Sequence, residues 1–223
     1  MNETTKTRNL LRREELALLT GKGIDVGCGN DPVVPDAVVF DRAQGDAAYI
    51  LRHLPAGAAY DYVYSSHCLE HLADPPTALG EWWSMVKPGG TLMLVVPDED
   101  LYELGYWPSL FNPEHRATFT IAKGLSWSPV SHNLCEMVLS LDRLDSWSIR
   151  LQDDRYDRRK ACFRGWPRFA AARAAWFRFR LWRRWPSTIP AFDQVCSLLR
   201  APIDQTLGDA VAQILVVAKK RAG

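Results

Sequence analysis

The chain has 223 residues, 47% of them hydrophobic, and its 27 Lys and Arg nearly balance its 26 Asp and Glu. This length suits one large domain with a substantial core. No apolar run reaches the length of a membrane span, no secretory signal is recognisable, and the five cysteines are scattered without a Cys-x-x-Cys pair. These features argue against a membrane span and a disulfide or zinc framework, and we expect a cytoplasmic protein with reduced thiols.

The first half of the chain alternates between helical and extended patterns. An amphipathic helix is predicted over residues 7–20, and glycines end it. Short apolar runs then predict strands over 24–26, 38–40 and 61–65, with a short edge strand at 47–50. A helix over 75–85 and a continuous apolar strand over 91–96 follow.

The second half is predicted to contain a helix over 132–141 capped by Ser131, a strand over 146–151 and a last strand over 210–218. Repetition of strand, turn, helix and strand is the signature of an α/β fold with a mainly parallel sheet. A long connection joins the last two strands instead of a regular crossover.

A glycine turn and a later carboxylate are the strongest functional signal. Gly27 and Gly29 follow the first strand, where they let the backbone turn sharply and approach a ligand. Asp41 follows the second strand and can accept hydrogen bonds from both hydroxyls of a ribose. The combination predicts a site for a cofactor that carries a nucleoside.

Polar residues also follow the other predicted strands, at Ser65, Ser66 and His67 and again at Asp98. Ligands of open α/β sheets bind beyond the carboxyl ends of the strands, so these side chains are expected to line one cleft.

Five ordered motifs resemble those of class I S-adenosylmethionine-dependent methyltransferases. They are residues 25–29, Asp41, residues 45–47, residues 60–72 and residues 86–92. The resemblance implies a Rossmann-like, seven-stranded, mainly parallel sheet with helices on both faces and an antiparallel last strand. It implies S-adenosylmethionine as the cofactor, bound by Asp25, Gly27, Cys28, Gly29, Asp41, Arg42, Asp46, Ala47, Ser65 and His67. Asp25 could hold the loop or contact the cofactor ammonium, and it is almost as well explained as a capping carboxylate.

Residues 66–71, 96–98 and 112–116 are similar to methyltransferases found among bacterial surface-polysaccharide genes. Two positions depart from the general family pattern. Asn30 replaces the usual third glycine of the first motif, and the segment before the last strand is much longer than a hairpin.

Methyl transfer to a sugar hydroxyl would benefit from a general base, because a hydroxyl is a poor nucleophile at neutral pH. The candidates are His115, His67 and Asp98, with no decisive preference between the two histidines. His67, like His71, is about equally well explained as a histidine that fixes a loop by hydrogen bonds. His71 and Arg116 are candidates for contacting the acceptor, the arginine for an anionic group. No metal is predicted, because the adjacent acids at 98–100 are more typical of a solvated loop.

The charge is distributed unevenly. Between Arg155 and Pro186 the chain has eleven Lys and Arg and a single acid, Asp157. Over residues 162–186 seven arginines alternate with eight Phe and Trp side chains. Such a segment suits an anionic membrane surface, a packed insertion whose arginines cover the acidic body, or, less well, nucleic acid.

Together these features predict one methyltransferase domain over residues 1–223, with a basic aromatic insertion at about 155–205. The expected activity is O-methylation of a sugar in bacterial cell-surface glycan synthesis, on a nucleotide-sugar or lipid-linked glycan, in the cytoplasm or at the inner face of the membrane. The alternatives are an RNA or DNA methyltransferase that uses the basic segment, and a non-catalytic methyltransferase-like subunit that recruits a glycan enzyme or the membrane.

Overall fold

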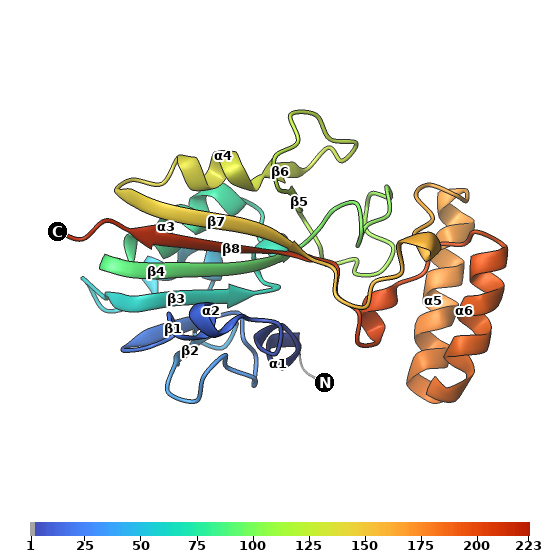
Figure 1. Cartoon of the computed structure of the whole chain (residues 1–223), viewed down its shortest axis with the longest axis horizontal. Helices are drawn as coiled ribbons and strands as arrows, with labels where there is room; N and C mark the ends of the chain where they lie inside the picture. Colours follow the sequence, from blue (N-terminus) through green and yellow to red (C-terminus); the bar gives the residue numbers. More distant parts are fainter. Residues whose placement is uncertain (1–2) are drawn as a thin grey trace.

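The computed structural model describes residues 3–223, and its central element is a six-stranded sheet of order β2-β1-β3-β4-β8-β7 (Figure 1). β1, β2, β3 and β4 run parallel to one another. β8 runs antiparallel to both of its neighbours, β4 and β7. The strands are β1 (Gly23–Val26), β2 (Val38–Phe40), β3 (Tyr60–Ser66), β4 (Val86–Pro97), β7 (Leu144–Gln152) and β8 (Gln213–Lys220). The Rossmann-like sheet with an antiparallel last strand is thus confirmed.

The prediction of seven strands is wrong. The segment expected to form the edge strand is a 3₁₀ helix, η1 (Ala47–Arg52). The side chain of Asp46 accepts a hydrogen bond from the Ala48 amide and caps this helix, and Ile50 is fully buried beneath it. The cap and the burial of one apolar side chain favour a helical turn over a short edge strand.

Two predicted helices have different bounds. The segment 7–20 forms two short helices, α1 (Glu3–Arg8) and α2 (Arg13–Leu16), because Glu15 accepts from the Arg12 amide and starts a new helix there. The helix expected from residue 132 is α4 (Leu134–Leu139), capped by Asn133. The preceding residues form β6 (Ser131–Asn133), which pairs with β5 (Thr118–Thr120) in a second small sheet.

Helices cover both faces of the large sheet, as predicted (Figure 1). On one face α3 (Pro75–Ser84) buries Trp82 and Trp83 completely, in one core with side chains of α4. The indole N–H groups of both tryptophans donate to backbone carbonyls, so that no polar group is left unpaired by their burial. The opposite face packs Tyr62, Tyr64 and Met93 against the leucines near α2.

Between β7 and β8 the chain leaves the sheet and forms a helical hairpin. Its arms are α5 (Arg168–Arg184) and α6 (Ile189–Leu198), joined by η4 (Pro186–Thr188). The two helices lie side by side beyond the carboxyl ends of the parallel strands, apart from the sheet (Figure 1). The other short helices are η2 (Leu69–His71), η3 (Arg158–Lys160) and η5 (Gln205–Leu207). Within residues 3–223, no helix combines the length and the apolar character needed to cross a bilayer.

Candidate functional site

The turn after β1 is built for close approach of a ligand. Gly27 has φ of +83° and Gly29 has φ of +58°, conformations that favour glycine. A Cβ atom on Gly27 would lie 2.5 Å from Cβ of Cys68, so any larger residue would displace the loop after β3. A Cβ on Gly29 would meet nothing within 4 Å, because this part of the turn borders open space.

Asp41 links the turn after β1 to the turn after β2. Its Oδ2 accepts a hydrogen bond of 2.7 Å from the Gly29 amide, and its Oδ1 accepts one of 2.7 Å from the Arg42 amide. The carboxylate therefore lies at the predicted cleft. Two backbone amides already orient its oxygens.

Two neighbouring cavities open at the carboxyl ends of the parallel strands. The first, of about 630 Å³, is lined by residues 27–31 on one side and by Tyr102, Asn112 and His115 on another. The second, of about 830 Å³, is lined by Arg42, Asp46 and Ala47 among others. Four residues border both cavities: Gly27, Asp41, His67 and His71.

Two predicted cofactor residues, Asp25 and Ser65, line neither cavity. Ser65 donates to the Val26 carbonyl, and Oδ2 of the fully buried Asp25 accepts a 2.6 Å hydrogen bond from the Val33 amide. Burial raises the pKa of Asp25 to about 7, against the opposing effect of the Val33 hydrogen bond. Both side chains therefore bond to backbone groups on either side of the glycine turn and do not face the cavities.

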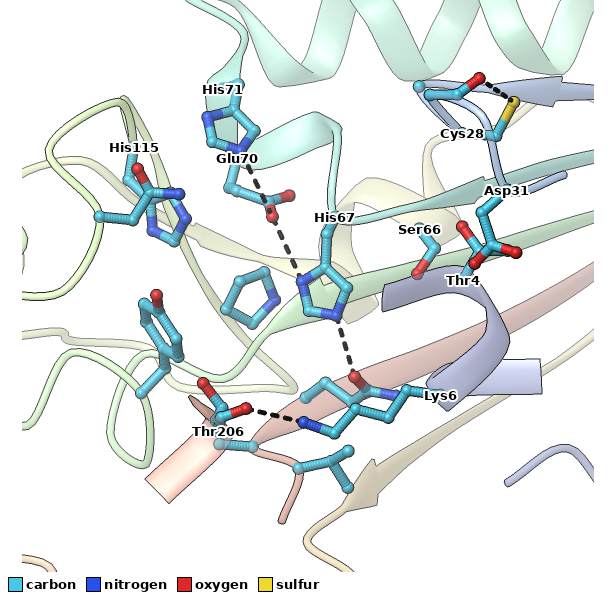
Figure 2. Close-up of a pocket in the computed structure, with 18 of the residues that line it drawn as sticks. Thr4, Lys6, Cys28, Asp31, Ser66, His67, Glu70, His71, His115 and Thr206 are labelled. Carbon is cyan, nitrogen blue, oxygen red and sulfur yellow. Dashed lines mark hydrogen bonds and ion pairs between the residues drawn. The ribbon is translucent and has the colours of Figure 1, made fainter. Parts of the chain in front are cut away.

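His67 stands where β3 ends and faces both cavities. Its Nε2 lies 2.9 Å from Oε1 of Gln213 on β8, and its Nδ1 lies 3.4 Å from Oε1 of Glu70. Its φ of +53° is uncommon for a residue with a Cβ. Figure 2 shows the ring held between these two partners, with Ser66 and Cys28 on one side and Glu70 and His71 on the other.

Glu70 is a buried carboxylate that sequence reasoning did not single out. Burial by itself raises its pKa, but the hydrogen bond with His67 and the charges of His67, His115 and His71 hold the pKa below its usual value. Glu70 lies three residues after His67 and one residue before His71. This spacing is the sequence signal from which a carboxylate partner of the histidines could have been identified.

His115 and Glu103 form a second buried acid–histidine pair. Nδ1 of His115 lies 2.7 Å from Oε1 of Glu103, and the two side chains are only 3% and 2% exposed. The ring of His71 packs edge-on to the His115 ring at 5.0 Å, and the Tyr102 ring lies 5.2 Å away. Within residues 3–223, no hydrogen bond engages Nε2 of His115. Glu103 has no sequence motif around it that could have revealed this role.

The remaining predicted residues are placed differently. His71 lines both cavities, with its Nδ1 3.2 Å from the Glu114 carbonyl, and Arg116 lines the second cavity. Asp98 lines neither cavity. Its Oδ1 accepts from the amides of Asp100 and Leu101, and burial raises its pKa to about 6. The structure thus brings three histidines together and leaves Asp98 apart from them.

The acids at 98–100 do not form an open ligand set. Glu99 is buried and accepts hydrogen bonds from Ser126, Ser131 and Thr118. Lys123 forms ion pairs with both Glu99 and Asp100. In the described part of the chain, one group of residues could offer three ligand atoms within 4.8 Å of one another: Glu70, His71 and His115.

Helix α1 forms part of the wall of the first cavity, through Thr4 and Lys6. Thr5 donates from its amide and its hydroxyl to the carboxylate of Asp31, at 2.7 Å each. Nζ of Lys6 donates to the Thr206 carbonyl at 2.8 Å (Figure 2) and to the Gly208 carbonyl at 3.0 Å. The helix thereby connects the cofactor turn to the segment that precedes β8.

A family model described as a methyltransferase domain matches residues 3–127, which is more than half of the chain. Solved structures with a similar fold include a SAM-dependent methyltransferase from Archaeoglobus fulgidus, at 17% identity and a TM-score of 0.50, over 97% of this chain and 94% of that one. A possible histamine N-methyltransferase from Thermotoga maritima has 14% identity and a TM-score of 0.49, over 99% and 88%.

Phosphoethanolamine N-methyltransferase 2 from Haemonchus contortus, solved with S-adenosyl-L-methionine, has 15% identity and a TM-score of 0.42, over 83% of this chain and 37% of that one. Among curated proteins, no match was found.

The residues present suit S-adenosylmethionine. The turn at Gly27 has no space for a side chain, Asp41 has a carboxylate at the cavity for a ribose, and Asp46 with Ala47 borders the second cavity, where an adenine would lie. Gly27, Cys28 and Gly29 would hold the methionine part against the first cavity. The chain therefore belongs to the methyltransferase-domain family, and it is a methyltransferase that uses S-adenosylmethionine.

Proposed function

We propose that this enzyme methylates a hydroxyl group of a sugar during the synthesis of a bacterial cell-surface glycan. The observation that carries the proposal is the His115–Glu103 pair, whose imidazole borders the same cavity as the cofactor turn. The similarity of residues 66–71, 96–98 and 112–116 to surface-polysaccharide methyltransferases supports the same class of acceptor.

An acceptor hydroxyl needs to lose its proton, and His115 is the residue best placed to take it. When bound, S-adenosylmethionine supplies a methyl group already activated by a positively charged sulfur. Nε2 of His115 would accept the hydroxyl proton, while Nδ1 keeps its own proton in the hydrogen bond with Glu103. The Glu103 carboxylate would stabilise the imidazolium that forms.

His67 is less suited to this step. Gln213 and Glu70 already engage its two ring nitrogens, so accepting a proton from a sugar would require breaking one of these contacts. Its place at the border of both cavities instead supports a role in binding the cofactor.

The residues after β3 argue against methylation of a nucleic-acid base. Ser65, Ser66, His67 and Cys68 stand there. The Asn/Asp-Pro-Pro-aromatic tetrapeptide that is associated with amino-group methylation of bases is missing from this position. A polar cavity with Tyr102, Asn112 and His115 along one side suits hydroxyl groups, which can donate and accept hydrogen bonds.

The test is a transfer assay with the whole protein and S-adenosylmethionine labelled in the methyl group. The acceptors are three separate pools: nucleotide sugars, lipid-linked glycans and RNA. We expect alkali-stable label in one of the two sugar pools. Label in RNA, or cofactor binding without transfer to any pool, would contradict the proposal and favour the nucleic-acid or the non-catalytic alternative respectively.

A further inference from the structure

The helical hairpin of α5 and α6 exposes an unusual number of aromatic side chains. On α5, Phe169 is 72% and Trp176 58% exposed, and four more rings of this hairpin are at least 38% exposed: Phe177, Phe179, Trp182 and Trp185. Aromatic residues of this size are normally buried in a monomeric protein. This much exposed aromatic surface on one hairpin indicates a region that another body covers.

The hairpin is attached to the domain through other residues, so these rings are not needed to hold it in place. Ala171 packs against Leu104 and Tyr106 of the domain, and the Tyr106 hydroxyl donates to the Trp166 carbonyl. Arg178 is buried and forms a two-pronged ion pair with Asp193, which joins α5 to α6. The exposed rings therefore remain available to a partner.

The hairpin and its flanks are also strongly cationic. Between residues 162 and 200 the chain has eight arginines and one acid, Asp193, which is already paired with Arg178. Within residues 3–223, no ion pair involves the other seven arginines of this stretch. Several of them lie over aromatic rings instead: Arg180 over Trp176 at 4.8 Å, and Arg184 over Trp185 at 5.4 Å.

Exposed aliphatic residues on the second arm distinguish between anionic partners. Val195 is 51%, Leu198 79% and Leu199 57% exposed on and just after α6. Nucleic acids offer phosphates and flat bases, which suit arginines and rings but leave aliphatic side chains without a partner. A lipid surface offers phosphates, an interfacial zone for rings, and acyl chains for leucines. A second copy of the hairpin is disfavoured because it would bring two sets of unpaired arginines together.

We propose that the α5–α6 hairpin docks this enzyme on an anionic phospholipid surface. Arginines would contact the lipid phosphates while the exposed rings and leucines enter the interface. The hairpin lies at the end of the molecule to which the parallel strands point, the same end as the cavities (Figure 1). Docking would thus bring the active site toward the membrane, whichever acceptor the enzyme uses.

The experiment is vesicle flotation of the full chain. We expect binding to vesicles of phosphatidylglycerol and phosphatidylcholine, no binding to pure phosphatidylcholine, and release at about 0.5 M salt, where charges are strongly screened. The charge variant Arg180→Gln/Arg183→Gln/Arg184→Gln should bind about a hundredfold more weakly, since each arginine near an anionic surface contributes to binding.

Two further variants make the result specific. The ring variant Phe169→Ser/Trp176→Ser should also lose most binding, although its charge is unchanged. The matched control Arg13→Gln/Lys219→Gln/Arg221→Gln removes the same charge from exposed positions outside the hairpin and should float like the wild type. Unchanged affinity for S-adenosylmethionine would show that all variants are folded.

Three results would overturn the proposal: no flotation of the wild type, flotation of the charge variant like the wild type, or equal loss in the matched control. Binding to single-stranded RNA with no binding to vesicles would assign the hairpin to nucleic acid. Salt-dependent dimers lost in the charge variant, without vesicle binding, would assign it to a second copy. A negative transfer assay with positive flotation would reject only the proposed function.

Discussion

Nδ1 of His115 lies 2.7 Å from Oε1 of Glu103, both side chains are buried, and His115 lines the cavity that the cofactor turn also borders. A Glu103 carboxylate can only accept from Nδ1, so the pair favours the tautomer with the proton on Nδ1 and leaves Nε2 as the nitrogen that could accept a proton. Mutation can also distinguish the two residues, because His115 would contact the acceptor whereas Glu103 would act through His115.

We expect His115→Gln to lower kcat by about 10²- to 10⁴-fold, the usual contribution of a general base. The affinity for S-adenosylmethionine, measured by calorimetry, should stay within about threefold, because the base acts in the chemical step. His67→Gln should show the opposite pattern, with weaker cofactor binding and a smaller effect on kcat. If the His67 variant instead lost the most kcat, the assignment of the base to His115 would be wrong.

Glu103→Gln keeps a hydrogen-bond acceptor for His115 but removes the negative charge. We expect kcat to fall by about 10- to 100-fold with little change in KM for the acceptor, because the imidazolium that forms on proton transfer loses the negative charge beside it. An unchanged kcat, or a loss confined to KM, would show that Glu103 does not assist the base.

Asp41→Ala should weaken binding of S-adenosylmethionine by about a hundredfold, because a carboxylate that accepts from two hydroxyls contributes on the order of 3 kcal/mol. Calorimetry measures this directly. Asp36→Ala, at an exposed acid of the same region, is the matched control and should bind like the wild type. Unchanged binding by the Asp41 variant would show that this carboxylate does not bind the ribose.

Asp25 should make the fold less stable as the pH rises. Its pKa is about 7 in the folded protein, against about 4 in an unfolded chain. A raised pKa in the folded state means that the stabilising contribution is complete below pH 4 and is lost between about pH 4 and 7. The loss amounts to roughly 4 kcal/mol.

Asp25→Asn cannot ionise, so its stability relative to the wild type should increase between pH 4 and 8. Urea unfolding at several pH values measures the difference. A constant difference between the two proteins over this range would mean that Asp25 titrates near its usual value in the fold.

We expect chelators to leave methyl transfer unchanged. Nε2 of His71 and Oε1 of Glu70 are 4.0 Å apart, whereas two ligands of a tetrahedral zinc ion lie about 3.4 Å apart. Assay of the enzyme before and after treatment with a chelator tests this. Loss of activity that a divalent metal restores would identify Glu70, His71 and His115 as a metal site.

The cofactor turn could be predicted from sequence because its requirements are local. A glycine with positive φ and a carboxylate at the end of the next strand leave a recognisable spacing at Gly27 and Asp41. The central strand β4 was predictable for a similar reason, since a buried parallel strand is a continuous apolar run, as at residues 91–96. The conformation of residues 47–50 could not be predicted in this way. The Asp46 cap and the tertiary burial of Ile50 make this segment a 3₁₀ helix and not an edge strand.

The acid–histidine pairs depend on contacts between distant segments. Glu103 and His115 lie in an irregular loop whose path is set by its packing, and no periodicity relates them. His67 has a partner on β8, 146 residues further along the chain. Sequence reasoning could identify the histidines as candidates but could not choose the carboxylate that each one uses.

Helix α1 forms part of the wall of the first cavity and is held there by polar contacts, among them the two hydrogen bonds of Thr5 with Asp31 and the two of Lys6 with backbone carbonyls. A helix of six residues has little stability of its own. Opening it would exchange these hydrogen bonds for bonds to water and would leave the tryptophan core around α3 intact. Local opening of α1 would therefore change one wall of this cavity at a small free-energy cost, while the rest of the domain stays folded.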